Sequence, residues 1–262
     1  MPTELGLHNP RGERVRELRS ARGRCEQGRF AIEGPTLIGE ALQSGITIRE
    51  IYAVADRLAD HPEIAALESP TLPIFAVSSR QYARWSELES PPGILAVVET
   101  PVGDPHAILA RPGTVLLLAG ISDPGNAGTL LRSAEAFGAA GALFGRGGVD
   151  PYTPKVVRAA MGSLFRLPVA TVDAGWLSPA AKAANRLVVA TDVTGDDIAR
   201  TALPPNVILA IGNERRGVRD FLAGWDVCVQ IPHQGPAQSL NAAVAGSILL
   251  YVLSRPDKKA CQ

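Results

Sequence analysis

Cysteine is scarce in this sequence, and the three cysteines present lie far apart. Cys25, Cys228 and Cys261 form no C-x-x-C pair among the 262 residues. Structural zinc sites and disulfide frameworks both need regularly spaced cysteines, so neither is expected, and free thiols fit a reducing compartment. The four histidines are isolated too, with no H-E-x-x-H motif and no evident Ser/His/Asp arrangement. We therefore expect no bound metal ion.

Long apolar runs are absent as well. No run reaches the ~18 residues that a membrane-spanning helix needs. The opening stretch MPTELGLHNPRGERV contains no apolar signal-peptide core. Neither sign of charge is in excess, since 26 Lys and Arg balance 26 Asp and Glu, so there is no global basic field that would indicate nucleic-acid binding. We expect a cytoplasmic protein that does not associate with membranes.

The charge is nevertheless uneven along the chain. Residues 11–29 carry seven Arg against three Glu. Such a cluster is either the solvated face of a helix or a patch that follows the phosphates of a nucleic acid. The sequence favours neither interpretation over the other, and both stay open at this point.

The length suits two domains, and residues 99–114, where proline and glycine gather, separate two halves. The first half alternates helical and strand-like segments, which predicts a small α/β domain. Helices are expected over 11–24, 35–45 and 79–88, and strands over 29–34, 48–54, 72–77 and 93–99. We place the domain boundary between residues 104 and 105, giving domains 1–104 and 105–262.

The second half has more strongly apolar strands and ends in an apolar helix. Continuous apolar runs of this kind are typical of parallel strands that helices bury on both faces. The strands are expected over 114–120, 141–145, 186–192, 206–212 and 227–232, and the last helix over 237–254. The fold class predicted from these patterns is α/β.

Three loops that follow strong strands carry polar residues. Parallel α/β sheets bind ligands at the carboxyl ends of their strands, so these loops can converge on one site. Their candidate residues are Asn126, Gly128 and Arg132 in the first loop, Asn213, Glu214 and Gly217 in the second, and Ser239, Leu240 and Asn241 in the third.

Each loop also has a purely structural interpretation, which taken alone is the more common one. Asn126 and the nearby glycines can form a turn and cap a helix over 128–137, and Arg132 can lie on the solvent-exposed face of that helix. Glu214 can form a weak surface ion pair with a neighbouring arginine. Ser239 and Asn241 can cap the last helix. No G-x-x-x-x-G-K-[ST] motif is present, which argues against a P-loop ATPase.

The three loops together resemble the motifs of the SpoU (TrmH) family of RNA ribose 2′-O-methyltransferases, in the SPOUT superfamily. The first motif, N-x-G-x-x-x-R, begins at Asn126, and the second, G-N-E-x-x-G, begins at Gly212. The third is I-P followed by S-L-N-x-x-x-A, and it begins at Ile231 and continues from Ser239. No motif position departs from the family pattern. The resemblance covers about residues 113–255, and residues 1–104 more weakly resemble an L30e-like RNA-binding domain.

This resemblance implies a C-terminal methyltransferase domain with a deep trefoil knot, a site completed across a homodimer interface, and S-adenosylmethionine as the cofactor. It implies that Gly212, Ile231 and Leu240 hold the adenosyl group. It further implies catalytic roles for Arg132, Asn126, Glu214, Ser239 and Asn241. A guanidinium stays charged near neutral pH, so we expect Arg132 to position the ribose and phosphate, with water as the eventual proton acceptor.

The expected substrate is structured RNA, with 23S rRNA first and tRNA second. Because the net charge is zero, we expect local basic residues to bind the RNA, and we nominate Arg19, Arg22, Lys155 and Arg158. Two other hypotheses compete with this one. A non-catalytic RNA-binding relative is opposed by the intact motifs, and an enzyme with another nucleotide cofactor is opposed by the missing phosphate loops.

Overall fold

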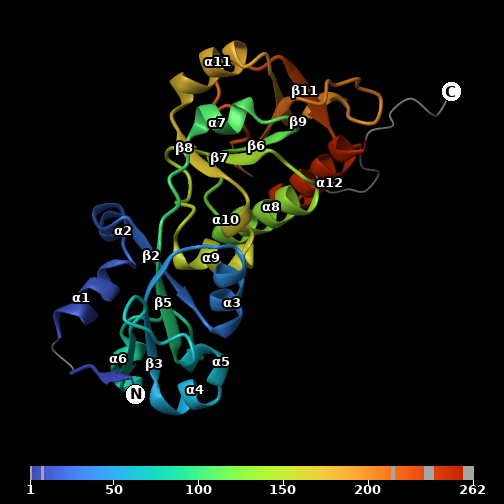
Figure 1. Ribbon diagram of the computed structural model, residues 1–262. Coiled ribbons are helices and arrows are strands. Elements are labelled where there is room, and N and C mark those ends of the chain that lie inside the picture. The colour runs from blue at the N-terminus through green and yellow to red at the C-terminus, as the bar shows by residue number, and fades with distance from the viewer. Residues whose placement is uncertain (1, 7–8, 214–215, 233–238, 256–262) are drawn as a thin grey trace. The chain divides into compact units, whose positions relative to one another are not determined.

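The computed structural model describes residues 2–6, 9–213, 216–232 and 239–255 (Figure 1). The chain divides into two compact units. The first unit consists of Met1–Pro101 and Tyr152–Phe165, and the second of Val102–Pro151 and Arg166–Gln262. The chain therefore leaves the first unit after Pro101 and returns to it for residues Tyr152–Phe165.

A five-stranded sheet with the order β1-β4-β3-β5-β2 forms the centre of the first unit. Its strands are β1 (Thr3–Glu4), β2 (Arg29–Glu33), β3 (Ile48–Val54), β4 (Ile74–Val77) and β5 (Ile94–Glu99). β5 runs antiparallel to both of its neighbours, while β4 is parallel to β1 and β3. The four longer strands confirm those predicted from the sequence. β1 was not predicted, because a pair of residues carries no readable pattern.

Short helices surround this sheet. They are α1 (Pro10–Glu17), α2 (Ala21–Gln27), α3 (Pro35–Gln43), α4 (Ala55–Ala59), α5 (Pro62–Ala65), α6 (Ser79–Ala83) and α9 (Pro154–Ala160). The single helix predicted over 11–24 is wrong. The helix breaks because Ser20 caps α2 by accepting a hydrogen bond from the backbone N–H of Gly23 at 3.0 Å. The break also needs a glycine at 23, since a Cβ there would lie 2.2 Å from the carbonyl oxygen of Glu17.

Aromatic contacts hold the segment Tyr152–Phe165 against β2 within the first unit. The ring of Phe30 on β2 lies 4.9 Å from the ring of Tyr152 and 6.4 Å from that of Phe165. Phe165 belongs to α10 (Ser163–Arg166), whose last residue is assigned to the second unit. Phe30 is completely buried, so this cluster removes its whole ring from water.

A six-stranded sheet with the order β11-β9-β10-β6-β7-β8 forms the centre of the second unit, and every neighbouring pair is parallel. Its strands are β6 (Val115–Ala119), β7 (Gly141–Gly145), β8 (Val169–Val172), β9 (Leu187–Asp197), β10 (Val207–Gly212) and β11 (Val227–Gln230). Every residue of β6, β7 and β10 is buried, as the apolar runs predicted. β8 was missed because its four residues directly follow Pro168 in a segment without a clear period.

Helices cover both faces of this sheet, which confirms the α/β arrangement predicted for the second half. They are α7 (Pro105–Ala110), α8 (Pro124–Ala136), α11 (Ala174–Ala183) and α12 (Ala242–Ser254). Leu109 of α7 and Leu177 of α11 share a buried cluster with Leu117 of the sheet. α8 and α12 lie side by side (Figure 1), and a Cβ at Gly246 of α12 would meet Leu130 of α8 at 2.3 Å. Across the described part of the chain, no helix combines the length and apolar character needed to cross a bilayer.

Candidate functional site

The three motif loops leave the second sheet at one edge. They follow β6, β10 and β11, which all run in the same direction. Gly212, the last residue of β10, pairs in register with Ala119, the last residue of β6. The first two loops therefore start side by side, at the edge where parallel α/β sheets bind ligands.

The first loop begins α8 earlier than predicted. Asp123 is the N-cap, and its Oδ1 accepts a hydrogen bond from the backbone N–H of Asn126 at 2.7 Å. Pro124 follows at the first helical position, where its fixed φ angle and missing N–H suit a helix start. The expectation that Asn126 caps a helix over 128–137 is therefore wrong. Asn126 lies in the first turn of α8, so its side chain does not serve as the cap.

Asn126 instead contacts the third loop through its side chain. Its Oδ1 accepts a hydrogen bond from Nδ2 of Asn241 at 3.1 Å. Asn241 is also the N-cap of α12, because its Oδ1 accepts from the backbone N–H groups of Ala243 and Val244 at 2.9 and 3.2 Å. One side chain thus starts the last helix and connects two motif loops. Ser239 takes no part in the cap, since it lies two residues before it.

The second loop depends on two glycines. Gly217 has a φ of +65°, and its backbone exchanges hydrogen bonds with that of Asn213 at 2.8 and 3.2 Å. A Cβ on Gly212 would lie 2.1 Å from the carbonyl carbon of Gly217, so only glycine allows this close approach. Nδ2 of Asn213 reaches the first loop, where Oγ of Ser122 accepts at 3.2 Å. Glu214 lies outside the described residues.

A cavity of about 510 Å³ opens between these loops. Its lining includes Gly212, Ile231 and Leu240, the three residues for which donor binding was expected, together with Ser239. The volume lies in the ~300–1,000 Å³ range of small-molecule sites, and backbone groups alternate with apolar side chains around it. The remaining described lining residues are Thr191, Asp192, Val193, Ile211, Asn213, Arg216, Gly217, Val229, Gln230, Ala242, Ala245 and Leu249.

Asp192 is a cavity residue that the sequence analysis did not single out. It lies at the point where β9 leaves its parallel pairing with β10, because the last pair in register is Ala190 with Ala210. A wider form of the rule that identified the other three loops reaches this residue, since Asp192 is the polar last residue of the predicted strand 186–192. Extending that rule to a fourth strand would have found Asp192.

Arg132 takes no part in the contacts that the described residues of its own chain make between the motif loops. It lies on α8, exposed, and none of the described residues forms a hydrogen bond or ion pair with it. It follows Asn126 by six residues, and because each helical residue turns by ~100°, its side chain leaves the helix ~120° away from that of Asn126. The structure therefore brings Asn126 and Asn241 together and gathers seven other motif residues around the cavity, but it places Arg132 in neither group.

The four nominated RNA-binding residues all lie in the first unit, and three of them face carboxylates. Arg19 Nε lies 3.4 Å from Glu87, and Arg22 Nε lies 2.7 Å from Glu26. Nη1 of Arg158 lies 3.8 Å from Oε1 of Glu33, whose side chain is only 6% exposed. Lys155 is exposed and has no ion-pair partner among the described residues. The Arg-rich segment therefore carries less uncompensated positive charge than its composition indicates.

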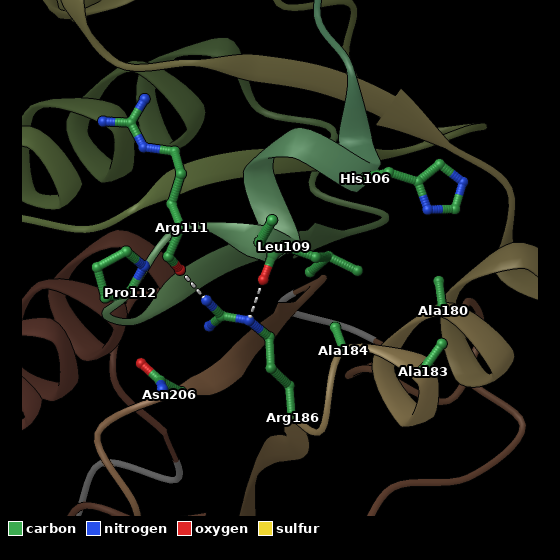
Figure 2. Close-up of a pocket in the computed structure, with 10 residues that line it drawn as sticks. His106, Leu109, Arg111, Pro112, Ala180, Ala183, Ala184, Arg186 and Asn206 are labelled. Carbon is green, nitrogen blue, oxygen red and sulfur yellow. Dashed lines mark hydrogen bonds between the residues drawn. The ribbon is translucent and has the colours of Figure 1, made fainter.

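A second cavity, of about 370 Å³, lies beside α7 and α11 (Figure 2). Its lining includes Arg186, which stands just before β9. Nε of Arg186 donates to the carbonyl of Leu109 at 2.8 Å, and its other nitrogens donate to the carbonyls of Arg111 and Gly113. Burial lowers the pKa of this guanidinium. Because backbone carbonyls accept hydrogen bonds from its guanidinium, Arg186 stabilises the segment between α7 and β6. Few of its N–H groups are left to bind a ligand.

No three His, Cys, Asp or Glu side chains come together to form a metal site within the ranges that the structure describes. Cys25 and Cys228 are free thiols, as predicted, and Cys261 lies outside the described residues.

Known proteins match this chain along nearly its whole length. Residues 113–251 match the SpoU rRNA Methylase family, and residues 9–96 match the MRM3-like substrate binding domain. The chain is 31% identical over 240 residues to the 23S rRNA (guanosine(2553)-2′-O)-methyltransferase RlmP of Bacillus subtilis, covering 91% of this chain and 93% of that one. It is 32% identical over 241 residues to a 23S rRNA (uridine(2479)-2′-O)-methyltransferase of Streptomyces viridochromogenes, covering 87% of this chain and 83% of that one.

A solved structure shares this architecture. The SpoU methyltransferase AviRb from Streptomyces viridochromogenes, in complex with the cofactor AdoMet, superimposes with a TM-score of 0.84 at 31% identity. The match covers 94% of this chain and 97% of that one.

Proposed function

Because this chain belongs to the SpoU rRNA methylase family, we propose that it methylates a ribose 2′-hydroxyl of 23S rRNA with S-adenosylmethionine as the methyl donor. One observation links the proposed function to particular residues. The three positions expected to hold the donor, which come from the second and third motifs, line a single cavity. A tRNA ribose is the second candidate substrate.

The cavity suits the donor in size and chemistry. Its volume falls in the small-molecule range, and the backbone amides and carbonyls at Gly212, Ile231 and Leu240 can read the edge of an adenine. The side chain of Leu240 adds apolar contact. When bound, the donor supplies a methyl group on a positively charged sulfur. The protein must then hold the ribose oxygen in line with that methyl group and provide a route for the hydroxyl proton.

We assign the acceptor side of the site to the polar residues of the first and third loops. The bridge between Asn126 and Asn241 fixes two amides in one place, from which they can hold the ribose together with Ser239. Glu214 completes this network in the proposal. Arg132 contacts the adjacent phosphate with two parallel hydrogen bonds, and its charge lowers the pKa of the 2′-hydroxyl, so that water takes the proton.

We further propose that the protein acts as a homodimer and that Arg132 serves the site of the partner. Two observations support this. Arg132 is exposed and is not among the described residues that line the cavity of its own chain. On α12, which packs beside α8, Val244, Ile248 and Tyr251 are 48%, 37% and 41% exposed. Their spacing of four and three residues makes one apolar stripe, and such a stripe is typical of a helix that packs against a partner.

We assign RNA binding and methyl transfer to different parts of the chain, following the two family matches. Residues 1–104 bind the RNA, with Arg19 and Arg22 contacting phosphates, and Lys155 and Arg158 add to this surface from α9. Residues 105–262 carry out methyl transfer and contain the trefoil knot expected from the family resemblance. We place the reaction in the cytoplasm.

Methyl transfer from labelled S-adenosylmethionine to separate pools of 23S rRNA, 16S rRNA and tRNA that lack native modification tests this function. Incorporation into 23S rRNA alone, lost in Arg132→Ala, is expected. Incorporation into tRNA alone would replace the substrate. Failure of the protein to bind the donor at all would overturn the methyltransferase assignment and leave an RNA-binding protein.

A further inference from the structure

The donor cavity contains one carboxylate among its described lining residues, that of Asp192. The one guanidinium among those residues belongs to Arg216, and it is directed to Asp220, whose Oδ2 lies 3.1 Å from Nη1. Asp192 is therefore the charged group that stands in the cavity without an ion-pair partner among the described residues. A charge in such a place either costs stability or has a ligand to bind.

Asp192 lies in the irregular part of β9, residues 191–195, between its last pair with β10 at Ala190 and the renewed pairing with β11 at Asp196. This segment, which we call the Asp192 loop, is held firmly in place. Oδ1 of Asp192 accepts hydrogen bonds from the backbone N–H and the hydroxyl of Thr194, at 2.9 and 2.7 Å. The side-chain amide of Gln230 donates to the carbonyl of Gly195 at 2.6 Å. A Cβ on Gly195 would lie 2.6 Å from the carbonyl carbon of Val229, so the loop packs directly onto β11. These contacts orient the carboxylate before any ligand arrives, which lowers the cost of binding.

The same contacts keep Asp192 ionised and leave one oxygen available. The hydrogen bonds from Thr194 lower its pKa; partial burial opposes them, and the positive charge of Arg219 adds the smallest effect, which also lowers the pKa. No described residue donates a hydrogen bond to Oδ2. The cavity therefore presents a fixed anionic acceptor that suits a neutral or positive hydrogen-bond donor.

The strand order indicates which part of the methyl donor meets this acceptor. β9 lies between β11 and β10, whereas the loop with Asn126 follows β6, two strands away from β9. The reacting end of the ligand is expected beside Asn126, so Asp192 faces its non-reacting part. Because the backbone of the other loops reads the adenine edge, two kinds of donor are left without an acceptor, the ribose hydroxyls of the adenosine and the ammonium of the methionine part. The ribose hydroxyls belong to the adenosine that these loops hold, so they are the donors we assign to Asp192.

We propose that Asp192 is a binding residue for the methyl donor and that its carboxylate accepts hydrogen bonds from the donor's ribose hydroxyls. This inference rests on the proposed function. It adds a contact from a fourth strand end to the three motif loops, and it explains why the loop after Ala190 is built to hold a carboxylate.

Calorimetric titration with S-adenosylhomocysteine and with its 2′,3′-dideoxy analogue tests the proposal. Asp192→Asn keeps the oxygen that Thr194 contacts, so the loop is expected to stay folded. Because a hydrogen bond to a charged group is removed, the affinity of this variant for S-adenosylhomocysteine should fall by about 10- to 100-fold. Its affinity for the dideoxy analogue should stay close to that of the wild type. Asp196→Asn, an exposed change near the same loop, is the matched control and should change neither affinity.

Two results would overturn this inference alone. One is an unchanged affinity of Asp192→Asn for S-adenosylhomocysteine, and the other is an equal decrease for both ligands, which would place the carboxylate against another part of the molecule. If the wild-type protein binds neither ligand, the proposed function fails instead. Titration of the wild type therefore separates the two cases before any variant is compared.

Discussion

The side-chain nitrogen of Asn241 lies 3.1 Å from the side-chain oxygen of Asn126, although 115 residues separate the two along the chain. The same Asn241 side chain caps α12 with its oxygen. The helix cap and the bridge that we propose for activity therefore use different atoms of one amide. This makes the two contributions separable by substitution.

Replacing Asn241 with Ser should separate them. Serine is a good N-cap but is too short to reach Asn126, so the free energy of unfolding should change by less than about 0.5 kcal/mol. Removal of the bridge should lower methyl transfer by about tenfold, the equivalent of one hydrogen bond. Asn241→Ala removes the cap as well and should cost about 1 kcal/mol of stability in addition. Urea unfolding measures the change in stability, and single-turnover rates on the same preparations measure the change in activity. If Asn241→Ser is as active as the wild type, the hydrogen bond between Asn126 and Asn241 does not contribute to methyl transfer.

Arg132→Ala should lower the rate of methyl transfer by about 100-fold or more while the donor affinity stays unchanged, because the guanidinium stabilises charge at the acceptor. Arg132→Lys keeps the charge but not the paired hydrogen bonds, so it should recover only part of the rate. Single-turnover rates and donor titration test this. If the residue at position 132 acted as a general base, the rate of the Arg132→Lys variant would instead rise with pH, because its ammonium group would lose its proton.

A mixture of two inactive variants tests whether Arg132 acts on the partner's site. Arg132→Ala has an intact cavity, and Leu240→Glu blocks the cavity but keeps the arginine. If Arg132 serves the partner, the purified mixed dimer should recover about half of wild-type activity, since each mixed dimer contains one complete site of two. Co-expression with two different tags, followed by purification of the mixed dimer, supplies the sample. No recovery in a verified mixed dimer would place Arg132 in the site of its own chain.

Charge reversal at Arg19 and Arg22 should weaken RNA binding and make it less dependent on salt. The logarithmic salt slope should fall by about one unit for each phosphate that the protein no longer neutralises. Donor binding should not change. Arg146→Glu in the second unit, whose arginine faces Asp173, makes the same change of charge elsewhere and is the control. If the affinity for RNA is unaffected at low and high salt, the pairs of Arg19 with Glu87 and of Arg22 with Glu26 are structural, and this segment does not contact RNA.

Most strands and the meeting of the motif loops could be predicted from the sequence because one physical rule links them, whereas the proposed donor-binding residues Gly212, Ile231 and Leu240 are implied by the family resemblance. Buried parallel strands need continuous apolar runs, and their carboxyl ends meet at one edge, so the loops at Gly212 and Ile231 had to lie near each other. Local capping could be predicted only in part. Asn241 caps its helix as expected, but Asp123 and Pro124 begin α8 one turn before the predicted start.

Side-chain direction and pairing could not be predicted. Arg24 belongs to the Arg-rich segment, yet it is only 5% exposed and donates to the carbonyl of Leu18 at 2.8 Å. Composition counts this residue as available charge, whereas the fold uses it to join two short helices. In the same way, the motif spacing contains Arg132 but does not reveal that this residue is exposed on α8 and absent from the described lining of the cavity.

The long separation between Asn126 and Asn241 also sets the order in which the protein matures during synthesis. The first loop and the core of its sheet are made well before the residues that follow β11, and contacts so distant in sequence form late. A nascent chain can therefore complete much of the second sheet while its site still lacks the third loop. The contact between Asn126 and Asn241 therefore forms only after residues beyond Asn241 have emerged and α12 has packed against α8.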